Sequence, residues 1–310
     1  MNQKKVIIDT DPGIDDALAL MMAIASESLD IRVVSAVFGN VNVEVALENI
    51  RRIFEVCKVQ KKPAIAKGAK VSLSGQIYKP RLVHGVGGLG NAQYDISSNN
   101  YKDLNASDVL KKCLIDDDID LLITLGPLTN IATLLIEEPA VKDRIREIVI
   151  MGGSVFTSGN ATEEAEFNFY QDPEAAKVVL KSKIPIRLIS LDVTRQLLFK
   201  AEVFKKISFN NGELSVFIKG MLDFGLNYHK KYRNRDGLYL PDVLALCAVI
   251  NEDLFSYRDL SLDVDINKER GKVFDNLDAG NTIKFCDKVN EDKVINLFVD
   301  TMNKLLMKRS

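Results

Sequence analysis

The 310-residue sequence has few cysteines, no excess of positive charge and no long apolar run. Its four cysteines are scattered and form no C-x-x-C pair, which favours a reduced protein with buried thiols. The net charge of −2 argues against nucleic-acid binding, which usually needs a basic face. No apolar run approaches the length of a membrane span, and MNQKK leads into a short strand without a signal-peptide core. We therefore expect a cytoplasmic protein that binds neither nucleic acid nor membranes.

Hydrophobic residues make up 46% of the chain and charged residues 27%, which is typical of a globular protein. Apolar runs that predict strands alternate with helix-like segments. We expect strands at 4–9, 31–38, 121–125, 148–151 and 184–190, and helices at 15–26, 44–57, 106–115, 129–136 and 173–180. Continuous apolar strands alternating with helices predict an α/β fold, a mostly parallel, Rossmann-like open sheet with helices on both faces.

The C-terminal part predicts additional helices and short strands. The expected helices are 201–207, 214–232, 242–250 and 290–308, and the expected strands lie near 260–266 and 281–286. We find neither an internal repeat nor a linker, so residues 1–310 are expected to form a single domain. Two long connections, 68–104 and 152–171, are rich in Gly, Ser and Asn. Long loops of this kind tend to build the site at the carboxyl ends of the strands.

The segment VIIDTDPGIDD places four carboxylates within eight residues, directly after the first expected strand: Asp9, Asp11, Asp15 and Asp16. A Pro-Gly turn separates the two pairs. The second pair falls in the first turn of a helix, where the helix dipole favours negative charge. Four converging carboxylates would raise one another's pKa values unless a cation neutralised them. The pattern therefore predicts a hard divalent cation with oxygen ligands.

Two other motifs suggest alternative functions. Asp9-Thr10-Asp11 has the D-x-D spacing of haloacid-dehalogenase-type phosphatases, but Gly13 departs from that pattern. The run from Gly85 to Gly90 fits G-x-G-x-x-G, but it follows no convincing strand, and no acidic residue lies about 20 positions further on. We interpret that run as a flexible loop with His84 at its edge.

Five further motifs narrow the range of protein families that the carboxylate cluster fits: FGN at 38–40, LGPLTNIA at 125–132, MGG at 151–153, AEFNFYQDPEAA at 165–176 and LPDVLAL at 240–246. In this order, from Val6 to about Ala248, the chain resembles the nucleoside hydrolase family of the inosine-uridine-preferring type. The resemblance implies hydrolysis of the N-glycosidic bond of ribonucleosides around a bound calcium ion. It also implies a homodimer or homotetramer.

The resemblance assigns roles residue by residue. The implied calcium ligands are Asp11, Asp16, Asp242 and the backbone carbonyl of Leu125, with Asp9 as a supporting residue. Asp11 also matches the general base that activates a metal-bound water. The implied substrate-binding residues are Asp15 and Asn168 at the 2′ and 3′ hydroxyls, Asn160 and Glu166 at the 5′ hydroxyl, Asn40 beside the metal, Met151 and Phe167 along the ribose, Asp242, and His84 near the base.

One position departs from the family pattern. Many members carry His before the last aspartate, and in some of them it protonates the leaving base, but this chain carries Pro241. The chain has only two histidines, His84 and His229. The segment 227–236 could supply another donor. A ribose- or nucleoside-binding protein with low turnover is therefore an alternative. The preferred base cannot be read from the sequence.

Overall fold

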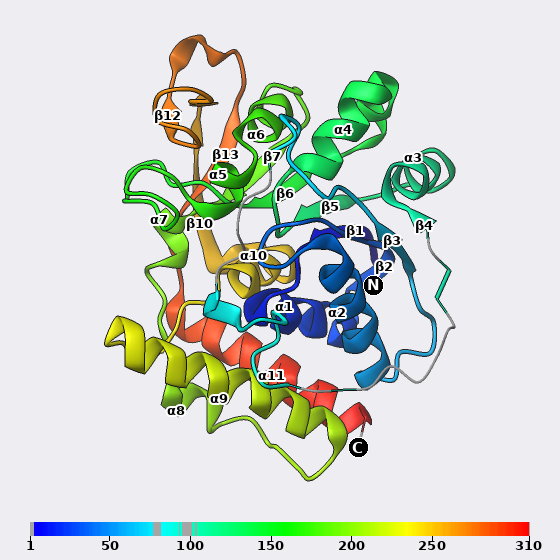
Figure 1. Cartoon of the computed structure of the whole chain (residues 1–310), viewed down its shortest axis with the longest axis vertical. Helices are drawn as coiled ribbons and strands as arrows, with labels where there is room; N and C mark the ends of the chain where they lie inside the picture. The colour runs from blue at the N-terminus through cyan, green and yellow to red at the C-terminus, as the bar shows by residue number, and fades with distance from the viewer. Residues whose placement is uncertain (1–2, 77–81, 93, 95–100, 103, 310) are drawn as a thin grey trace.

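The computed structural model describes residues 3–76, 82–92, 94, 101–102 and 104–309. Its centre is a sheet of nine strands (Figure 1). From one edge to the other, the strands are β10 (Phe255–Leu260), β13 (Ile283–Val289), β7 (Ile186–Ile189), β6 (Ile148–Met151), β5 (Leu121–Thr124), β1 (Lys4–Thr10), β2 (Leu29–Ala36), β3 (Ala64–Lys67) and β4 (Leu104–Asn105). Among the described strands of this sheet, only the β10–β13 pair is antiparallel, so the predicted mostly parallel sheet is confirmed.

Helices cover both faces of the sheet, as predicted. Along β1, Val6 and Ile8 belong to one core cluster and Ile7 to the other, because successive side chains of a strand point to opposite faces. The first cluster includes residues of α1 (Ile14–Ala25), α2 (Val43–Val56), α9 (Glu213–Arg233), α10 (Pro241–Ile250) and α11 (Glu291–Arg309). The second includes residues of α3 (Ala106–Asp116), α4 (Thr129–Glu137) and α6 (Pro173–Leu180). Val6, Ile7 and Ile8 are almost completely buried, which explains the continuous apolar run of the sequence.

The order of the strands predicts where a ligand site lies. The chain continues from β1 to β2 on one side, whereas β5 pairs with β1 on its other side. In open α/β sheets, ligands bind outside the carboxyl ends of the strands at such a reversal. The segments that follow β1 and β5 are therefore the expected walls of a pocket.

The structure also contains smaller elements: a 3-10 turn η1 (Leu82–His84), the short helices α5 (Phe167–Gln171), α7 (Leu191–Thr194) and α8 (Ala201–Phe204), the pair β8 (Phe199–Lys200) and β9 (Gly237–Leu238), and the hairpin β11 (Leu262–Val264) and β12 (Val273–Asp275). The helices predicted at 201–207, 214–232, 242–250 and 290–308 correspond to α8, α9, α10 and α11, and the strand predicted near 281–286 corresponds to β13.

Three local predictions were wrong. The expected strand 260–266 is divided between β10 and β11, which belong to different sheets. The strand β3 was missed because four residues give too little periodicity to detect. The helix α5 lies inside a predicted loop, since its five residues are held by a side-chain cap rather than by an apolar stripe. Part of the expected loop 68–104 lies outside the described residues.

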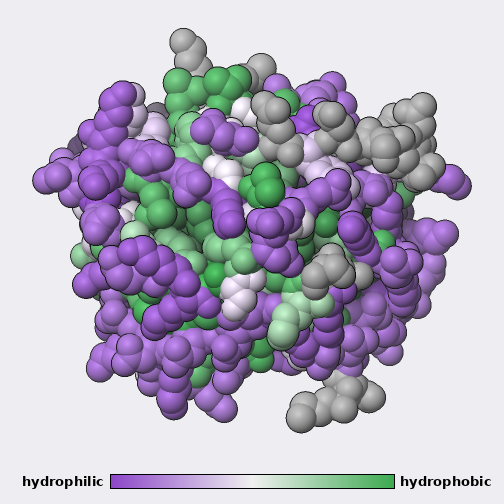
Figure 2. Space-filling view, turned by 90° about the horizontal axis from the view of Figure 1, so that it is seen from below, coloured by the Kyte–Doolittle hydropathy of each residue, from purple (hydrophilic) through white to green (hydrophobic). Residues whose placement is uncertain are grey.

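All four cysteines are buried, as predicted, and none of them forms a disulfide. Among the residues that the structure describes, no helix combines the length and the apolar character needed to cross a membrane. Hydrophilic residues dominate the face shown in Figure 2, and apolar residues are visible between them.

Candidate active site

The carboxylate motif forms the turn between β1 and α1. Asp16 lies in the first turn of α1, where one carboxylate oxygen accepts the backbone N–H of Gly13 at 3.0 Å. The other oxygen accepts the hydroxyl of Thr10 at 2.6 Å. The bond from Gly13 satisfies a backbone N–H that the start of a helix otherwise leaves without a partner. Together the two bonds fix the carboxylate of Asp16 near the positive end of the helix dipole.

The loop after β2 holds the two innermost carboxylates from the other side. The backbone N–H of Asn40 donates to Asp11 Oδ2 at 2.5 Å, and its side-chain amide donates to Asp16 Oδ2 at 3.1 Å. The preceding residue, Gly39, allows this approach, since a Cβ there would lie 2.0 Å from Asp11 Oδ2. Asp11 and Asp16 are completely buried.

Asp9 takes no part in the pocket lining. Its carboxylate accepts hydrogen bonds from the hydroxyl of Ser35 and from the side-chain amide of Asn130, the latter at 2.7 Å. Asn130 also donates to the carbonyl of Ala36 at 3.0 Å and accepts the backbone N–H of Ala69 at 2.8 Å. Burial raises the pKa of Asp9 to about 7, against these hydrogen bonds. These hydrogen bonds connect the ends of β1 and β2 and the loop after β3.

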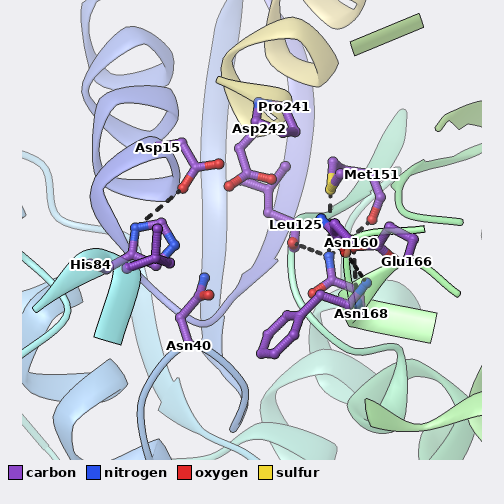
Figure 3. Close-up of a pocket in the computed structure, with 12 residues that line it drawn as sticks. Asp15, Asn40, His84, Leu125, Met151, Asn160, Glu166, Asn168, Pro241 and Asp242 are labelled. Atoms are coloured by element: carbon purple, nitrogen blue, oxygen red, sulfur yellow. Dashed lines mark hydrogen bonds and ion pairs between the residues drawn. The ribbon is translucent and has the colours of Figure 1, made fainter. Parts of the chain in front are cut away.

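Asp242 brings a further carboxylate to this group from the start of α10. One oxygen each of Asp15, Asp16 and Asp242 lie within 4.8 Å of one another, and these three residues could hold a metal ion. In Figure 3, the carboxylates of Asp15 and Asp242 point toward each other. Burial raises the pKa of Asp242 well above its usual value, and the charges of Asp15, Asp16 and Asp11 raise it further. Asp11 behaves in the same way, with burial as the main cause and Asp16 as the next.

The chemistry of these oxygens fits a hard cation. Asp11 Oδ1, Asp15 Oδ1 and Asp242 Oδ1 are buried and have no hydrogen-bond partner in the structure. Buried carboxylate oxygens are costly without a partner, and an oxygen-seeking divalent ion would satisfy them. The structure brings Asp15 as well as the expected Asp16 and Asp242 into the group, while Asp11 adjoins it through Asp16.

Asn168 forms the opposite wall, together with the ends of β5 and β6. Its side-chain amide donates to the carbonyl of Leu125 at 2.7 Å and to that of Met151 at 3.2 Å (Figure 3). Because both amide hydrogens are used, the oxygen Oδ1 is the atom left to accept a hydroxyl from a ligand.

Glu166 and Asn160 shape the rim of the pocket. The carboxylate of Glu166 accepts backbone N–H groups of Gly153 at 2.9 Å, Asn168 at 2.9 Å and Phe169 at 3.1 Å, so it caps the short helix α5. Asn160 accepts the backbone N–H of Phe167 at 2.8 Å through its side-chain oxygen. These bonds explain how five residues form a helix without an apolar stripe.

Most of the expected substrate residues meet in one pocket. Its lining consists of Asp15, Asn40, Val83, His84, Leu125, Met151, Asn160, Glu166, Phe167, Asn168, Pro241 and Asp242. Every substrate residue expected from the sequence is in this set. Asp11 and Asp16 do not line the pocket, because both are buried next to it. Val83, which lies in η1, was not among the residues expected from the sequence.

A second compartment adjoins the first and shares Asp15, Val83 and His84 with it. His229 and Tyr239 line its other side. The backbone N–H of Ile14 donates to His84 Nδ1 at 3.1 Å, which leaves Nε2 as the nitrogen that carries the proton in the neutral ring. Burial lowers the pKa of His229 to about 4, so that imidazole is neutral near pH 7. Sequence reasoning named His229 only as one possible donor.

A carboxylate cluster that could hold a metal, facing amide groups at the switch point of a parallel sheet, defines an enzyme site for a small hydroxylated ligand. The family profile described as inosine-uridine preferring nucleoside hydrolase matches residues 6–296. The chain belongs to this family, and it is therefore an enzyme, a ribonucleoside hydrolase. This membership decides against a phosphatase built on Asp9 and Asp11.

Individual relatives agree with the family. The chain is 34% identical to uridine nucleosidase 1 of Arabidopsis thaliana over 259 residues, which cover 82% of this chain and 76% of that protein. It is 36% identical to the pyrimidine-specific ribonucleoside hydrolase RihA of Photobacterium profundum over 255 residues, 82% of each chain. The solved structure of the plant nucleoside hydrolase PpNRh1 superposes with a TM-score of 0.91 at 27% identity, covering 97% of this chain and 99% of that chain.

Proposed function

We propose that this enzyme hydrolyses the N-glycosidic bond of ribonucleosides around a calcium ion. The observation that supports the proposal best is the set of buried carboxylate oxygens without hydrogen-bond partners, on Asp11, Asp15 and Asp242, beside a wall of amide groups. A hard cation and a sugar with several hydroxyls are together the ligands that such a pocket suits.

Asp11, Asp16, Asp242 and the carbonyl of Leu125 would hold the calcium ion. When bound, calcium would supply the positive charge that lowers the pKa of water beside it. Asp15 remains the partner of the ribose 2′ and 3′ hydroxyls, together with the free oxygen of Asn168. Asn40 holds Asp11 and Asp16 in place through the two bonds described above.

Asp11 would act as the general base. Its Oδ2 is occupied by the backbone N–H of Asn40, so its unpartnered Oδ1 is the atom that accepts the proton of the attacking water. As the glycosidic bond breaks, the sugar passes through an oxocarbenium-like state, and the nearby carboxylates stabilise its positive charge. Asn160 and Glu166 are assigned to the 5′ hydroxyl, and Met151 and Phe167 to the apolar side of the ribose.

We assign the second compartment, with His84 at its entrance, to the base, and we propose uridine as the preferred substrate. Relatives at 34% and 36% identity are named for uridine and for pyrimidine ribonucleosides. A reducing-sugar assay with uridine, cytidine, inosine, adenosine and guanosine tests the proposal. Release of ribose, fastest from uridine, is expected. Nucleoside binding without release would support the binding-protein alternative.

The residues of the site suggest that the leaving base is protonated slowly. Pro241 lines the pocket where many members carry histidine, and His229 is neutral near pH 7. A nitrophenyl riboside, whose leaving group needs no proton, should therefore react much faster than inosine, by up to the roughly 10²- to 10⁴-fold that general-acid catalysis contributes. Single-turnover kinetics with both substrates measure this ratio.

The variant Pro241→His should recover part of the inosine rate and leave the nitrophenyl riboside rate almost unchanged. The gain is limited because Pro241 occupies the first position of α10, where its fixed backbone angle suits the helix. Equal rates for inosine and the nitrophenyl riboside in the unmutated enzyme would mean that another residue already donates the proton. His84, His229 and Tyr232 would then be the residues to replace.

Calcium should stabilise the fold more at alkaline pH. Burial raises the pKa values of Asp11, Asp15, Asp16 and Asp242 above the 3.8 of an exposed aspartate. Above that value the metal-free folded state binds more protons than the unfolded chain, so its stability falls as pH rises through the raised pKa values. Calcium neutralises the carboxylates and removes this loss.

Differential scanning fluorimetry of chelated protein, with and without added calcium, measures the calcium-induced rise in Tm at several pH values. The rise should grow as pH increases through the raised pKa values of these carboxylates. Comparing the rise, rather than Tm itself, cancels groups that calcium does not contact, such as His229. A rise that is independent of pH would contradict the assignment of the carboxylates to the metal.

The proposal treats residues 1–310 as one catalytic domain that assembles as a homodimer or homotetramer. Light scattering on the purified protein measures the assembly. The cytoplasmic location remains a prediction from the sequence.

A further inference from the structure

The loop between β6 and α5 carries Asn160 to the rim of the pocket, and backbone hydrogen bonds hold only its second half. In the described part of the chain, residues 154–158 form no hydrogen bond between backbone groups. The side chains of Ser158 and Asn160 are exposed. Exposed loops without backbone pairing are usually mobile, so other groups must fix this one.

Two side chains of the segment 190–195, which follows β7, supply those bonds. The carboxylate of Asp192 accepts the backbone N–H groups of Val155 at 2.9 Å and Phe156 at 2.8 Å. The hydroxyl of Ser190 donates to the same carboxylate at 2.8 Å and orients it. The first half of the loop is therefore attached to the start of α7.

Arg195, directly after α7, holds the second half. Its guanidinium donates to the hydroxyl of Thr157 at 3.3 Å, to the carbonyl and the hydroxyl of Ser158, the latter at 3.1 Å, and to the carbonyl of Gly159 at 2.7 Å. A planar group with five donors can bridge these oxygens, whereas a lysine ammonium cannot reach them all.

Beyond Gly159, the chain forms a tight turn onto α5. The backbone N–H of Gly159 donates to the carbonyl of Glu163 at 2.6 Å, and that of Asn160 donates to the carbonyl of Ala165 at 3.1 Å. The carbonyl of Gly159, which Arg195 binds, belongs to the peptide bond that joins Gly159 to Asn160. A shift of Arg195 would move Asn160 relative to Asn168 and the rest of the pocket.

The geometry points to Arg195, with Asp192, as a positioning residue that sets Asn160 and so makes the enzyme selective for nucleosides with a free 5′ hydroxyl. This inference rests on the proposed function, in which Asn160 binds that hydroxyl. Arg195 does not touch the substrate. It acts through the carbonyl of Gly159 and the turn that follows.

A purely structural role predicts a different result. If Arg195 only stabilised the loop, its loss would lower Tm and slow all substrates alike. A positioning role affects only the interaction with the 5′ hydroxyl. Uridine and 5′-deoxyuridine differ in that group alone, so their ratio separates the two roles.

The test compares kcat/KM for both nucleosides in the unmutated enzyme, Arg195→Lys, Arg195→Ala and Asn160→Ala. The control is Arg146→Lys, which alters an exposed arginine paired with Asp120 at 2.7 Å, before the amino end of β5. In Arg195→Lys, uridine should lose roughly 5- to 10-fold, the effect of one neutral hydrogen bond, with 5′-deoxyuridine changed by no more than about twofold. Adding Arg195→Lys to Asn160→Ala should cause little further loss, because the two residues act as a unit.

Equal losses for the two substrates, in both Arg195 variants, would overturn the inference and leave Arg195 with a structural role. If the unmutated enzyme released no ribose from either nucleoside, the proposed function would fail instead. Titration calorimetry with the same two nucleosides would then decide the inference from binding. A preference for uridine that Arg195→Lys removes would support it, and an unchanged preference would overturn it.

Discussion

Replacing Asp11 by asparagine should nearly abolish hydrolysis, with kcat lowered by at least the roughly 10²- to 10⁴-fold that a general base contributes. An amide cannot accept the proton of the attacking water. It also weakens the oxygen shell offered to the cation. Steady-state and single-turnover release of ribose from uridine measure the loss.

Two variants serve as controls for Asp11→Asn. Asn168→Ala removes one contact with the ribose hydroxyls and should cost less than Asp11→Asn, mainly through KM. Asp120→Asn removes a carboxylate that pairs with Arg146, far from the pocket, and should leave kcat unchanged. A larger loss for Asn168→Ala than for Asp11→Asn would count against Asp11 as the base.

Nucleosides without the 2′ hydroxyl should react far more slowly than ribonucleosides. Asp15 Oδ1 is buried without a hydrogen-bond partner, 3.9 Å from His84 Nδ1, and Asn168 has only its Oδ1 left to accept a hydroxyl. Without the 2′ hydroxyl, these groups stay unpaired, at a cost of several kcal/mol, which corresponds to roughly 10³-fold or more in kcat/KM.

Competition between uridine and 2′-deoxyuridine in one reaction measures this ratio directly. Asp15→Ala should reduce it by lowering the rate for uridine more than that for 2′-deoxyuridine. Equal kcat/KM values for the two nucleosides in the unmutated enzyme would be incompatible with the assigned ribose site.

The sheet and the carboxylate site could be predicted because their signals are local. Continuous apolar runs identify buried parallel strands, and the ends of such strands meet at one edge. Asp11 and Asp16 follow β1 closely, so the local pattern alone indicated an acidic site. Asp242, in the first turn of α10, was assigned to the same site only through the resemblance to the family.

The remaining features of the fold and the site could not be predicted, because they depend on packing between segments that are distant in the sequence. His229 meets His84 only because α9 packs beside η1, which no local pattern indicates. Asn130 was part of a quoted motif, but its bonds to Asp9, Ala36 and Ala69 depend on three strand ends lying together. Short elements such as β3 and α5 were missed for a similar reason. They are stabilised by neighbours and caps, and their own sequences carry little periodicity.

Release of ribose from uridine by metal-free enzyme, before and after calcium is added back, tests the central claim most directly. Protein stripped with a chelator and then dialysed should release almost no ribose, and calcium should restore the rate with about one ion bound per chain. Elemental analysis of the same samples provides the stoichiometry. Full activity in the metal-free protein, or no ribose in either state, would contradict the account.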